Sequence, residues 1–542
     1  MSPHLWQSAP DSERLLLGTR LLPLLVLVAL LFRLYFYVGL VSGDPQDDGL
    51  YYQNALDIFE SGPTYLERYR NLPADFLANP VDQFNFRPLT TYPSAFAFRV
   101  FGPGEGAAVL WSLACSMLSM AVVYRLATLL EGPVAGLFAA FLVAIYPLDV
   151  VLATRILSDG PVGCFCGLGV LGAFSARATT EQRAMWAYFS GIAFGLGYLA
   201  NPRALLVLGL VIVLTASTIG VAVRSWRTPA WLLFGFATVF LAEAAIYFWT
   251  TGHPFLNLEI HNGASTFKYL HEPVTAWRWG PLEVHFTNGR PLQISQTVFH
   301  LRSAPTDLFG LYFFLFAAAV ADAVLRRRYL FVATLGLALF AFLEFGFVGI
   351  HLNLTKRVIE YWMVFKQERF LTILTVPLIA LSACFLASTA RRHPFAVTGM
   401  LILLTMTSVR AIDGTYAFYR AGLSDLRTVA GDVLGQPDRI FHTDPWAETH
   451  LRIFTQYRAH NLRGISREDG PYLNSDACVI VGGSRGVELL ADYVEGVLPP
   501  WARQLLSEEQ PSADWKLVRL VSGPRSAQRL HDLRIYCRSS RD

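Results

Sequence analysis

Charged side chains are scarce in this sequence. Asp, Glu, Lys and Arg make up 16% of its 542 residues, whereas 53% are hydrophobic, and a soluble protein usually carries roughly 25% charged residues. The mean hydropathy is +0.39. These values exclude an ordinary soluble protein as the description of the whole chain.

Basic stretches and cysteines are also few. The net charge is only +3 and no basic stripe runs along the chain, so we expect no nucleic-acid partner. Cys164 and Cys166 have no metal-ligand spacing and no neighbouring histidine, and we interpret them as packing residues. Cys478 and Cys537 lie in a polar C-terminal tail. They could form a disulfide if that tail is extracytoplasmic, and otherwise stay separate thiols.

Long apolar runs are abundant instead. A run of about 20 residues crosses a hydrocarbon core of ~30 Å, and such runs predict a polytopic α-helical membrane protein with about eleven transmembrane helices. The predicted spans cover residues 15–41, 106–130, 133–152, 158–176, 185–201, 203–222, 229–250, 306–325, 329–350, 369–388 and 394–412.

Arginines in the short connections predict the orientation. With the N-terminus inside, every basic cluster falls on the cytoplasmic side, as the positive-inside rule requires. These clusters are Arg177 with Arg183, Arg224 with Arg227, Arg326 to Arg328, and Arg391 with Arg392. The same count places the loops 42–105, 252–305 and 351–368 outside together with the tail, whereas an even number of spans would place the tail inside. Arginine outnumbers lysine, which favours a bacterial inner membrane as the location.

The composition becomes that of a soluble protein from about Arg427. We therefore divide the chain into a transmembrane module over 1–426 and a small extracytoplasmic α/β domain over 427–542. Short strands are predicted at 439–442, 478–481, 516–521 and 533–537, and helices at 448–457 and 487–497.

The most unusual polar stretch follows the first span and reads Gly43-Asp44-Pro45-Gln46-Asp47-Asp48-Gly49-Leu50-Tyr51-Tyr52. Apolar residues at three- and four-residue steps from Leu50 to Phe59 predict a surface helix that ends at Gly62-Pro63. Capping of this helix would explain one or two of the carboxylates. It does not explain three carboxylates beside a bilayer, where charge is costly. We favour a catalytic or ligand-binding role, because carboxylates at such sites commonly act as bases.

Several motifs resemble those of the GT-C superfamily of membrane glycosyltransferases, in the branch that contains protein O-mannosyltransferases and the lipid A aminoarabinose transferase. Asp47-Asp48-Gly49-Leu50-Tyr51, followed by Ala55, is similar to that family's Asp-Glu-x-x-Tyr-x-x-x-Ala signature. The other matching segments, in the family's order, are Arg87-Pro88-Leu89 with Phe101-Gly102, Tyr146-Pro147 with Leu157-Ser158-Asp159-Gly160-Pro161, Gly252-His253-Pro254-Phe255, and Glu368-Arg369-Phe370-Leu371 with Pro377.

The resemblance implies a reaction and a base. Members of this family move a sugar from a polyprenyl-phosphate donor to a glycan, lipid or protein acceptor on the outer face, with inversion. By alignment their general base is Asp47, and Asp48 stands where the family usually has glutamate. Asp44 is extra to the pattern. With Asp48 it could hold a divalent cation such as Mg²⁺ or Mn²⁺, as some family members do; no other cofactor is indicated.

Further residues could support this chemistry. Tyr51 and Tyr52 adjoin the acidic stretch, and Asp159 matches a family aspartate that steadies the site or simply caps a helix. Four cations fall at the outer interface and could bind the lipid phosphate or only reach toward the membrane surface: Arg87, Arg203, Lys366 and Arg369. Glu243 and Glu344 lie within apolar spans and match no motif, so we interpret them as structural carboxylates.

Two other classes of function remain as alternatives. A transporter or flippase of lipid-linked sugars would place polar, broken helices at the bilayer midplane, whereas the acidic residues of this chain concentrate in outer loops. A non-catalytic protein with the same fold that binds glycolipid is the other alternative. An assay of sugar transfer separates both of them from an enzyme.

Overall fold

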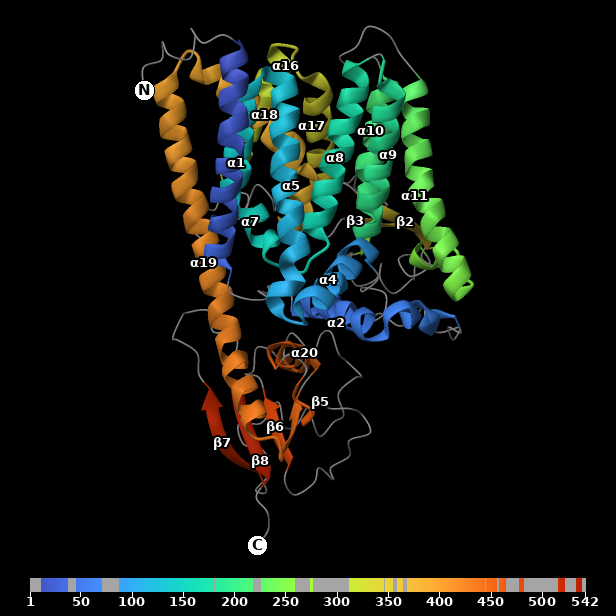
Figure 1. The fold of residues 1–542 in the computed structure, drawn as a ribbon, viewed down its shortest axis with the longest axis vertical. Helices are drawn as coiled ribbons and strands as arrows, with labels where there is room; N and C mark the ends of the chain where they lie inside the picture. Colours follow the sequence, from blue (N-terminus) through green and yellow to red (C-terminus); the bar gives the residue numbers. More distant parts are fainter. Residues whose placement is uncertain are drawn as a thin grey trace.

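A computed structural model shows the fold (Figure 1). It describes residues 11–37, 45–70, 87–179, 181–217, 226–258, 273–275, 311–345, 347–353, 358–363, 368–443, 445–455, 458–464, 477–481, 515–521 and 533–538. The protein is mostly helical, with a small sheet at one end of the helix bundle.

Helices make up nearly all of the N-terminal four-fifths of the described chain. They are α1 (Asp11–Phe36), α2 (Pro45–Ser61), η2 (Gly62–Tyr69), α4 (Pro88–Phe101), α5 (Glu105–Glu131), α6 (Pro133–Ile145), α7 (Pro147–Ala153), α8 (Asp159–Ala178), α9 (Arg183–Ala200), α10 (Ala204–Ala216), α11 (Arg227–Thr251), α16 (Tyr312–Leu325), α17 (Leu330–Phe345), η4 (Glu368–Leu374), α18 (Thr375–Ala390), α19 (Pro394–Gly435) and α20 (Pro445–Phe454).

A helix lies at each of the predicted apolar spans, but fewer of these helices are long enough to count as spans. Five described segments are long and apolar enough to cross a membrane, and a sixth results if α6 and α7, which meet at a 59° bend, form one span. The five are α5, α8, α11, Arg369–Ala390 and Pro394–Tyr416. Shorter apolar helices lie at Leu21–Phe36, Ala204–Ala216, Tyr312–Leu325 and Leu330–Leu343.

Two of the predicted cytoplasmic clusters meet at one end of the bundle. Glu131, at the end of α5, pairs with Arg391 at 2.9 Å and lies 3.9 Å from Arg328. The loops that precede α17 and α19 therefore lie together. Figure 1 shows α2, α4 and the C-terminal sheet beyond the opposite end of the bundle.

The predicted amphipathic helix is confirmed as α2, which lies across the end of the bundle (Figure 1). Tyr51, Tyr52, Ala55 and Leu56 are all buried along one side of it. The expected stop at Gly62 is confirmed, because α2 ends at Ser61 and Gly62 adopts a positive φ of 61°. The chain then continues as the 3₁₀ helix η2, which the sequence did not predict.

Two of the predicted outer loops and the end of the predicted span 329–350 contribute a small sheet that the sequence pattern did not indicate. Its strands are β1 (Pro273–Thr275), β2 (Phe347–Asn353) and β3 (Val358–Met363). They pair antiparallel in the order β1-β3-β2. The predicted end of that span is wrong, because α17 stops at Phe345 and residues 347–350 belong to a strand.

The C-terminal domain contains a five-stranded sheet in the order β5-β4-β6-β8-β7. Its strands are β4 (Ile440–Thr443), β5 (Leu462–Gly464), β6 (Ala477–Val481), β7 (Trp515–Val521) and β8 (Leu533–Arg538), so the four predicted strands are confirmed and β5 was missed. Helix α20 confirms the helix predicted at 448–457, whereas 487–497 lies outside the described residues.

Helix α19 connects the two parts of the molecule. It runs without interruption for 42 residues, and its end supplies Leu426, Val429, Ala430 and Val433 to the core of the domain. Asn461 donates hydrogen bonds to the carbonyls of Val433, Gln436 and Arg439, which satisfies carbonyl groups at and just beyond the end of the helix.

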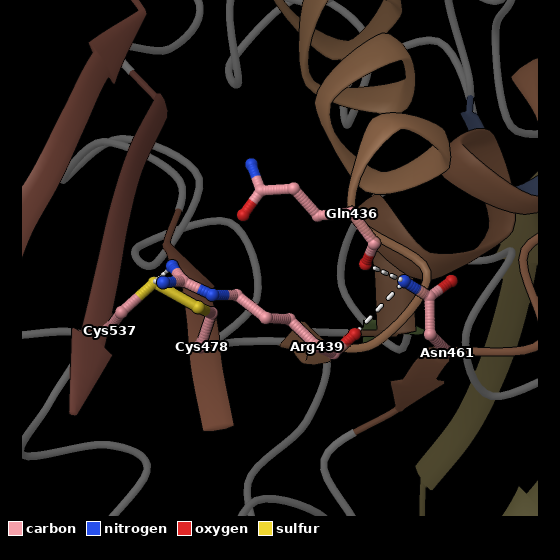
Figure 2. Close-up of a disulfide and its surroundings, with 5 residues drawn as sticks. All are labelled: Gln436, Arg439, Asn461, Cys478 and Cys537. Atoms are coloured by element: carbon pink, nitrogen blue, oxygen red, sulfur yellow. Dashed lines mark hydrogen bonds between the residues drawn. A yellow bond between two sulfur atoms is a disulfide. The ribbon is translucent and has the colours of Figure 1, made fainter. Parts of the chain in front are cut away.

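A disulfide joins β6 to β8, as Figure 2 shows. Cys478 and Cys537 face each other in the antiparallel register of these strands, and Arg439 lies over the bridge, with its Nη1 3.8 Å from the sulfur of Cys537. Of the two alternatives left open by the sequence for these cysteines, the structure shows the disulfide.

Candidate active site

The acidic stretch forms the first turn of α2. Asp44 lies outside the described residues, as does the side chain of Asp47, although the backbone of Asp47 belongs to the helix. Asp48 is 1% exposed. Its Oδ2 accepts hydrogen bonds from Nε and Nη2 of Arg155 at 3.0 and 2.7 Å. Because the helix starts at Pro45, Asp48 lies inside its first turn. The charge of Asp48 is neutralised by Arg155, which is 107 positions away in the sequence.

Arg155 belongs to the break between α7 and α8. This connection ends in the Leu157-Ser158-Asp159 motif, and Pro161 falls in the first turn of α8, where a missing N–H costs little. Ser158 Oγ accepts hydrogen bonds from Tyr51 at 3.4 Å and from Asn201 at 3.1 Å. The break thus fastens the start of α2 to the junction of α9 and α10.

Tyr52 lies beside Tyr51 but plays a packing role. It is fully buried, and its ring centroid lies 5.1 Å from that of Phe98. Burial, reinforced by the charge of Glu105, raises the pKa of Tyr52 above its ordinary value. Its phenol therefore stays neutral and cannot serve as an anionic base.

Arg203 is held by the α9–α10 junction. Pro202 forces the preceding Asn201 into an extended conformation, with φ −161° and ψ 131°. Asn201 Oδ1 then accepts hydrogen bonds from the backbone N and Nε of Arg203 at 3.1 and 3.2 Å. Nη2 of Arg203 pairs with Asp159 at 2.5 Å. Its remaining nitrogen, Nη1, is buried and has no hydrogen-bond partner within the described part of the chain.

Arg203 and Arg369 flank one aromatic ring. The guanidinium carbons of Arg203 and Arg369 lie 4.0 and 5.7 Å from the ring centroid of Phe370, a range in which cation–π attraction operates. Arg203, Arg369 and Asp159 therefore lie close together. Two arginines here make the region attractive to an anion.

The other predicted cations are less closely joined to this group. Arg87 immediately precedes Pro88, the first residue of α4, and it is close enough to Tyr198 to interact with it electrostatically. Lys366 lies outside the described residues.

Sequence reasoning missed four members of this network: Arg155, Ser158, Asn201 and Phe370. Two of them, Ser158 and Phe370, lie within the matched segments 157–161 and 368–371, so those segments were the available signal. No sequence signal pointed to Arg155, because its partner Asp48 is 107 positions away.

The two residues proposed to hold a divalent cation are not both described. Asp48 accepts hydrogen bonds from the guanidinium of Arg155, and Asp44 lies outside the described residues. Within those residues no group of three or more His, Cys, Asp or Glu side chains could hold a metal ion.

One stretch of the chain matches a known family at the sequence level. Residues 86–249 match the family described as dolichyl-phosphate-mannose-protein mannosyltransferase. The matched stretch is less than half of the chain. It contains Arg87, Asp159 and Arg203 but not the acidic turn of α2. No curated protein sequence matches the chain.

Three solved structures share its fold. ArnT from Cupriavidus metallidurans in the apo state aligns with a TM-score of 0.52 at 14% identity, over 96% of this chain and 98% of that one. The same protein bound to undecaprenyl phosphate gives 0.53 and 13% over the same shares. The oligosaccharyltransferase AglB from Archaeoglobus fulgidus, in complex with an inhibitory peptide and a dolichol-phosphate, gives 0.50 and 13% over 81% of this chain and 64% of that one. These matches confirm the fold that the resemblance to GT-C membrane glycosyltransferases implies.

Proposed function

We propose that the protein is an inverting GT-C glycosyltransferase that moves a sugar from a polyprenyl-phosphate donor to an acceptor. One observation carries the proposal. The acidic turn of α2 is tied, through Tyr51, Ser158 and Asn201, to a pair of arginines at the same end of the bundle. A base and an anion-binding group are both needed for transfer from a lipid phosphate.

The proposed reaction begins at Asp47. Its carboxylate takes the proton of the acceptor hydroxyl as that oxygen attacks the anomeric carbon of the sugar. The bond from that carbon to the phosphate oxygen breaks on the opposite face, so the configuration inverts and the lipid phosphate leaves with the electron pair. Asp48, held by Arg155, fixes the first turn of α2 and so positions Asp47.

Arg203 and Arg369 are the proposed phosphate contacts. Nη1 of Arg203 has hydrogens to donate, and guanidinium groups suit phosphate oxygens. Asp159 and Asn201 already hold the other nitrogens of Arg203, so the group is preorganised. Arg87 and Lys366 complete the proposed set of cations.

The nature of the donor is inferred from the proteins that share the fold. ArnT is bound to undecaprenyl phosphate in one structure, and AglB to a dolichol-phosphate and an inhibitory peptide in another. We infer a polyprenyl-phosphate sugar for this chain, with a glycan, lipid or protein acceptor.

The proposed location is a bacterial inner membrane, crossed about eleven times, with the acidic turn and the domain outside. The disulfide supports this orientation, because disulfides persist in oxidising compartments. The basic loops around Glu131, at the opposite end of the bundle, also support it.

Replacement of the base tests the proposal. We expect Asp47→Asn to lower the turnover of polyprenyl-phosphate sugars by roughly 10²- to 10⁴-fold, while the protein stays folded. Asp57→Asn, on the same helix, is the matched control and should transfer sugar as the parent does. The assay measures sugar transfer and release of sugar-free lipid phosphate by purified protein.

Each outcome of this assay distinguishes between the enzyme, the transporter and the non-catalytic protein. Normal transfer by Asp47→Asn would overturn the assignment of the base. Movement of intact donor across a vesicle membrane, without transfer in the parent, would favour the transporter. Donor binding with neither transfer nor transport would favour the non-catalytic alternative.

A further inference from the structure

Helix α11 carries a buried carboxylate, although most of its apolar stretch is exposed. Only 22% of its most apolar stretch is buried inside the protein, yet Glu243 is 8% exposed. A carboxylate inside an apolar span is costly unless it has a structural partner or a function.

The partners of Glu243 are neutral. Asn257, just beyond the end of α11, donates a hydrogen bond from Nδ2 to Glu243 Oε1 at 2.7 Å. Tyr247, one turn along α11, is a second hydrogen-bond partner. Within the described residues no lysine, arginine or histidine forms an ion pair with Glu243. The carboxylate therefore retains acceptor capacity that a cation would otherwise take.

Two neighbouring polar atoms also lack partners. The Oδ1 of Asn257 and the hydroxyl of Tyr198 are buried, and neither has a hydrogen-bond partner in the part of the chain that the structure describes. Tyr198, on α9, interacts electrostatically with Glu243. Buried polar atoms normally have hydrogen-bond partners. Tyr198, Glu243 and Asn257 each keep capacity for a further hydrogen bond, and together they indicate a polar ligand.

Aromatic rings adjoin these groups. The ring centroid of Tyr198 lies 6.0 Å from that of Phe236 and 5.9 Å from that of Phe240. Phe240 stacks on Phe255 at 6.1 Å. Apolar and aromatic walls with a few convergent polar groups are typical of small-molecule sites.

This cluster adjoins the proposed phosphate contacts. Tyr198 lies one turn before Asn201, which holds Arg203, and Tyr198 also interacts with Arg87. Glu243 would repel a phosphate, so the phosphate and the cluster's ligand must be different groups. A sugar linked to that phosphate is neutral, carries hydroxyl donors and lies next to it.

We propose that Glu243, Asn257 and Tyr198 form the subsite that recognises the hydroxyl groups of the donor's sugar. This inference rests on the proposed function. Glu243 accepts a hydrogen bond from one hydroxyl, Asn257 Oδ1 accepts another, and the Tyr198 hydroxyl donates to a sugar oxygen. Recognition through neutral hydroxyls separates the sugar-bearing lipid from the sugar-free lipid phosphate that is released.

Binding of matched lipids tests the subsite. The probes are polyprenyl phosphate bearing mannose, glucose, galactose or 4-amino-arabinose, and the sugar-free polyprenyl phosphate. For the sugar that the parent binds most tightly, we expect Glu243→Leu and Asn257→Leu to weaken binding by about 10- to 100-fold, the loss of a hydrogen bond to a charged or buried partner. Binding of the sugar-free lipid should stay unchanged.

Controls separate recognition from structural damage. Thr250→Val, on α11 but exposed and bonded only to its own helix, should bind every lipid as the parent does. Glu243→Gln keeps the shape and one acceptor, so it should lose less than Glu243→Leu if the contacted group is a hydroxyl. An equal loss with Glu243→Gln would instead assign the contact to the amine of an amino sugar.

Several results would overturn the subsite. If Glu243→Leu weakens the binding of sugar-bearing and sugar-free lipid equally, Glu243 has a structural role. If it weakens the binding of neither, Glu243 does not belong to the subsite. A parent that prefers no sugar-bearing lipid over the sugar-free one would also contradict it. The proposed function fails differently, through normal transfer by Asp47→Asn or through a parent that binds no lipid phosphate.

Discussion

At the scale of single residues, the buried pair of Asp48 and Arg155 determines where the acidic turn lies. The two side chains are 2% and 7% exposed. Two charges in such surroundings attract each other strongly, but each was costly to desolvate. Removing one of them therefore costs more than the pair contributes in total.

We expect Arg155→Met to lower the free energy of unfolding by about 3–5 kcal/mol, because it leaves the Asp48 carboxylate buried without a counter-charge. Unfolding in an SDS titration measures this change. Arg326→Ala is the matched control, since its i,i+4 pair with Asp322 is exposed and should change stability by less than about 1 kcal/mol.

A double variant distinguishes charge from packing. Asp48→Asn combined with Arg155→Met removes both charges, so it should recover part of the stability that Arg155→Met loses. If the double variant is as unstable as the sum of the single variants, the two residues do not interact and the pair has no special role.

The predicted site residues differ in how far sequence alone could place them. Asp47 and Asp159 were proposed from local motifs, because a motif records the order of residues near one another in the chain. Arg155 was not, because an ion pair across 107 positions leaves no periodic trace. The same holds for Phe370, whose position between Arg203 and Arg369 depends on how η4 packs against α8.

At the scale of secondary-structure elements, the bent pair α6–α7 depends on a buried arginine. Pro147 has no N–H to donate to the carbonyl of Val143, and the bend frees the carbonyl of Ala144 as well. Arg33 of α1 donates to both carbonyls, at 3.1 and 3.2 Å. It also pairs with Asp149 at 2.5 Å. The bend is therefore satisfied by a side chain from another helix.

We expect Arg33→Leu to destabilise the protein by about 3–5 kcal/mol, since it removes the cation that pairs with the Asp149 carboxylate and leaves Ser116 as that carboxylate's remaining side-chain donor. Arg33→Lys should keep only part of the stability that Arg33→Leu loses, because one ammonium group cannot reach all of these acceptors from a single position. SDS unfolding again measures both variants. Equal stability of Arg33→Leu and the parent would show that water or another side chain satisfies the bend.

The elements themselves were predictable to different degrees. Apolar runs and the 3.6-residue period of α2 act locally, so the helices were expected where they lie. The strands β2 and β3 were not expected, because β3 lies between β2 and the strand β1, which is distant in sequence. The continuity of α19 was also missed. Its polar second half suggested a new domain, whereas in the structure its apolar side continues into the domain core.

At the scale of the whole molecule, the C-terminal domain is fastened to the helix that carries the acidic turn. Helix α20 contacts α2. Beside this contact, Arg427 of α19 makes a two-pronged ion pair with Glu105 at 3.1 and 2.7 Å. Its guanidinium also lies 4.2 Å from the ring centroid of Phe454. The domain and the acidic turn must therefore lie on the same side of the membrane.

That shared side can be measured with two single-cysteine additions. Arg458 is exposed in the domain, and Glu181 is exposed in the short connection between α8 and α9. The four unpaired native cysteines, Cys115, Cys164, Cys166 and Cys384, are buried, and the other two form the disulfide. Background labelling of the parent should therefore be small.

We expect a membrane-impermeant maleimide to label Arg458→Cys in intact cells, and to label Glu181→Cys only after the membrane is opened. The reason is electrostatic. Arg177, near Glu181, lies over the ring of Phe331 at the start of α17, so this connection belongs with the arginines around Glu131, and such clusters stay in the cytoplasm. The reverse labelling pattern would place the acidic turn inside the cell. It would rule out a lipid-linked donor presented at the outer face, while leaving the ion pairs that hold the turn unchanged.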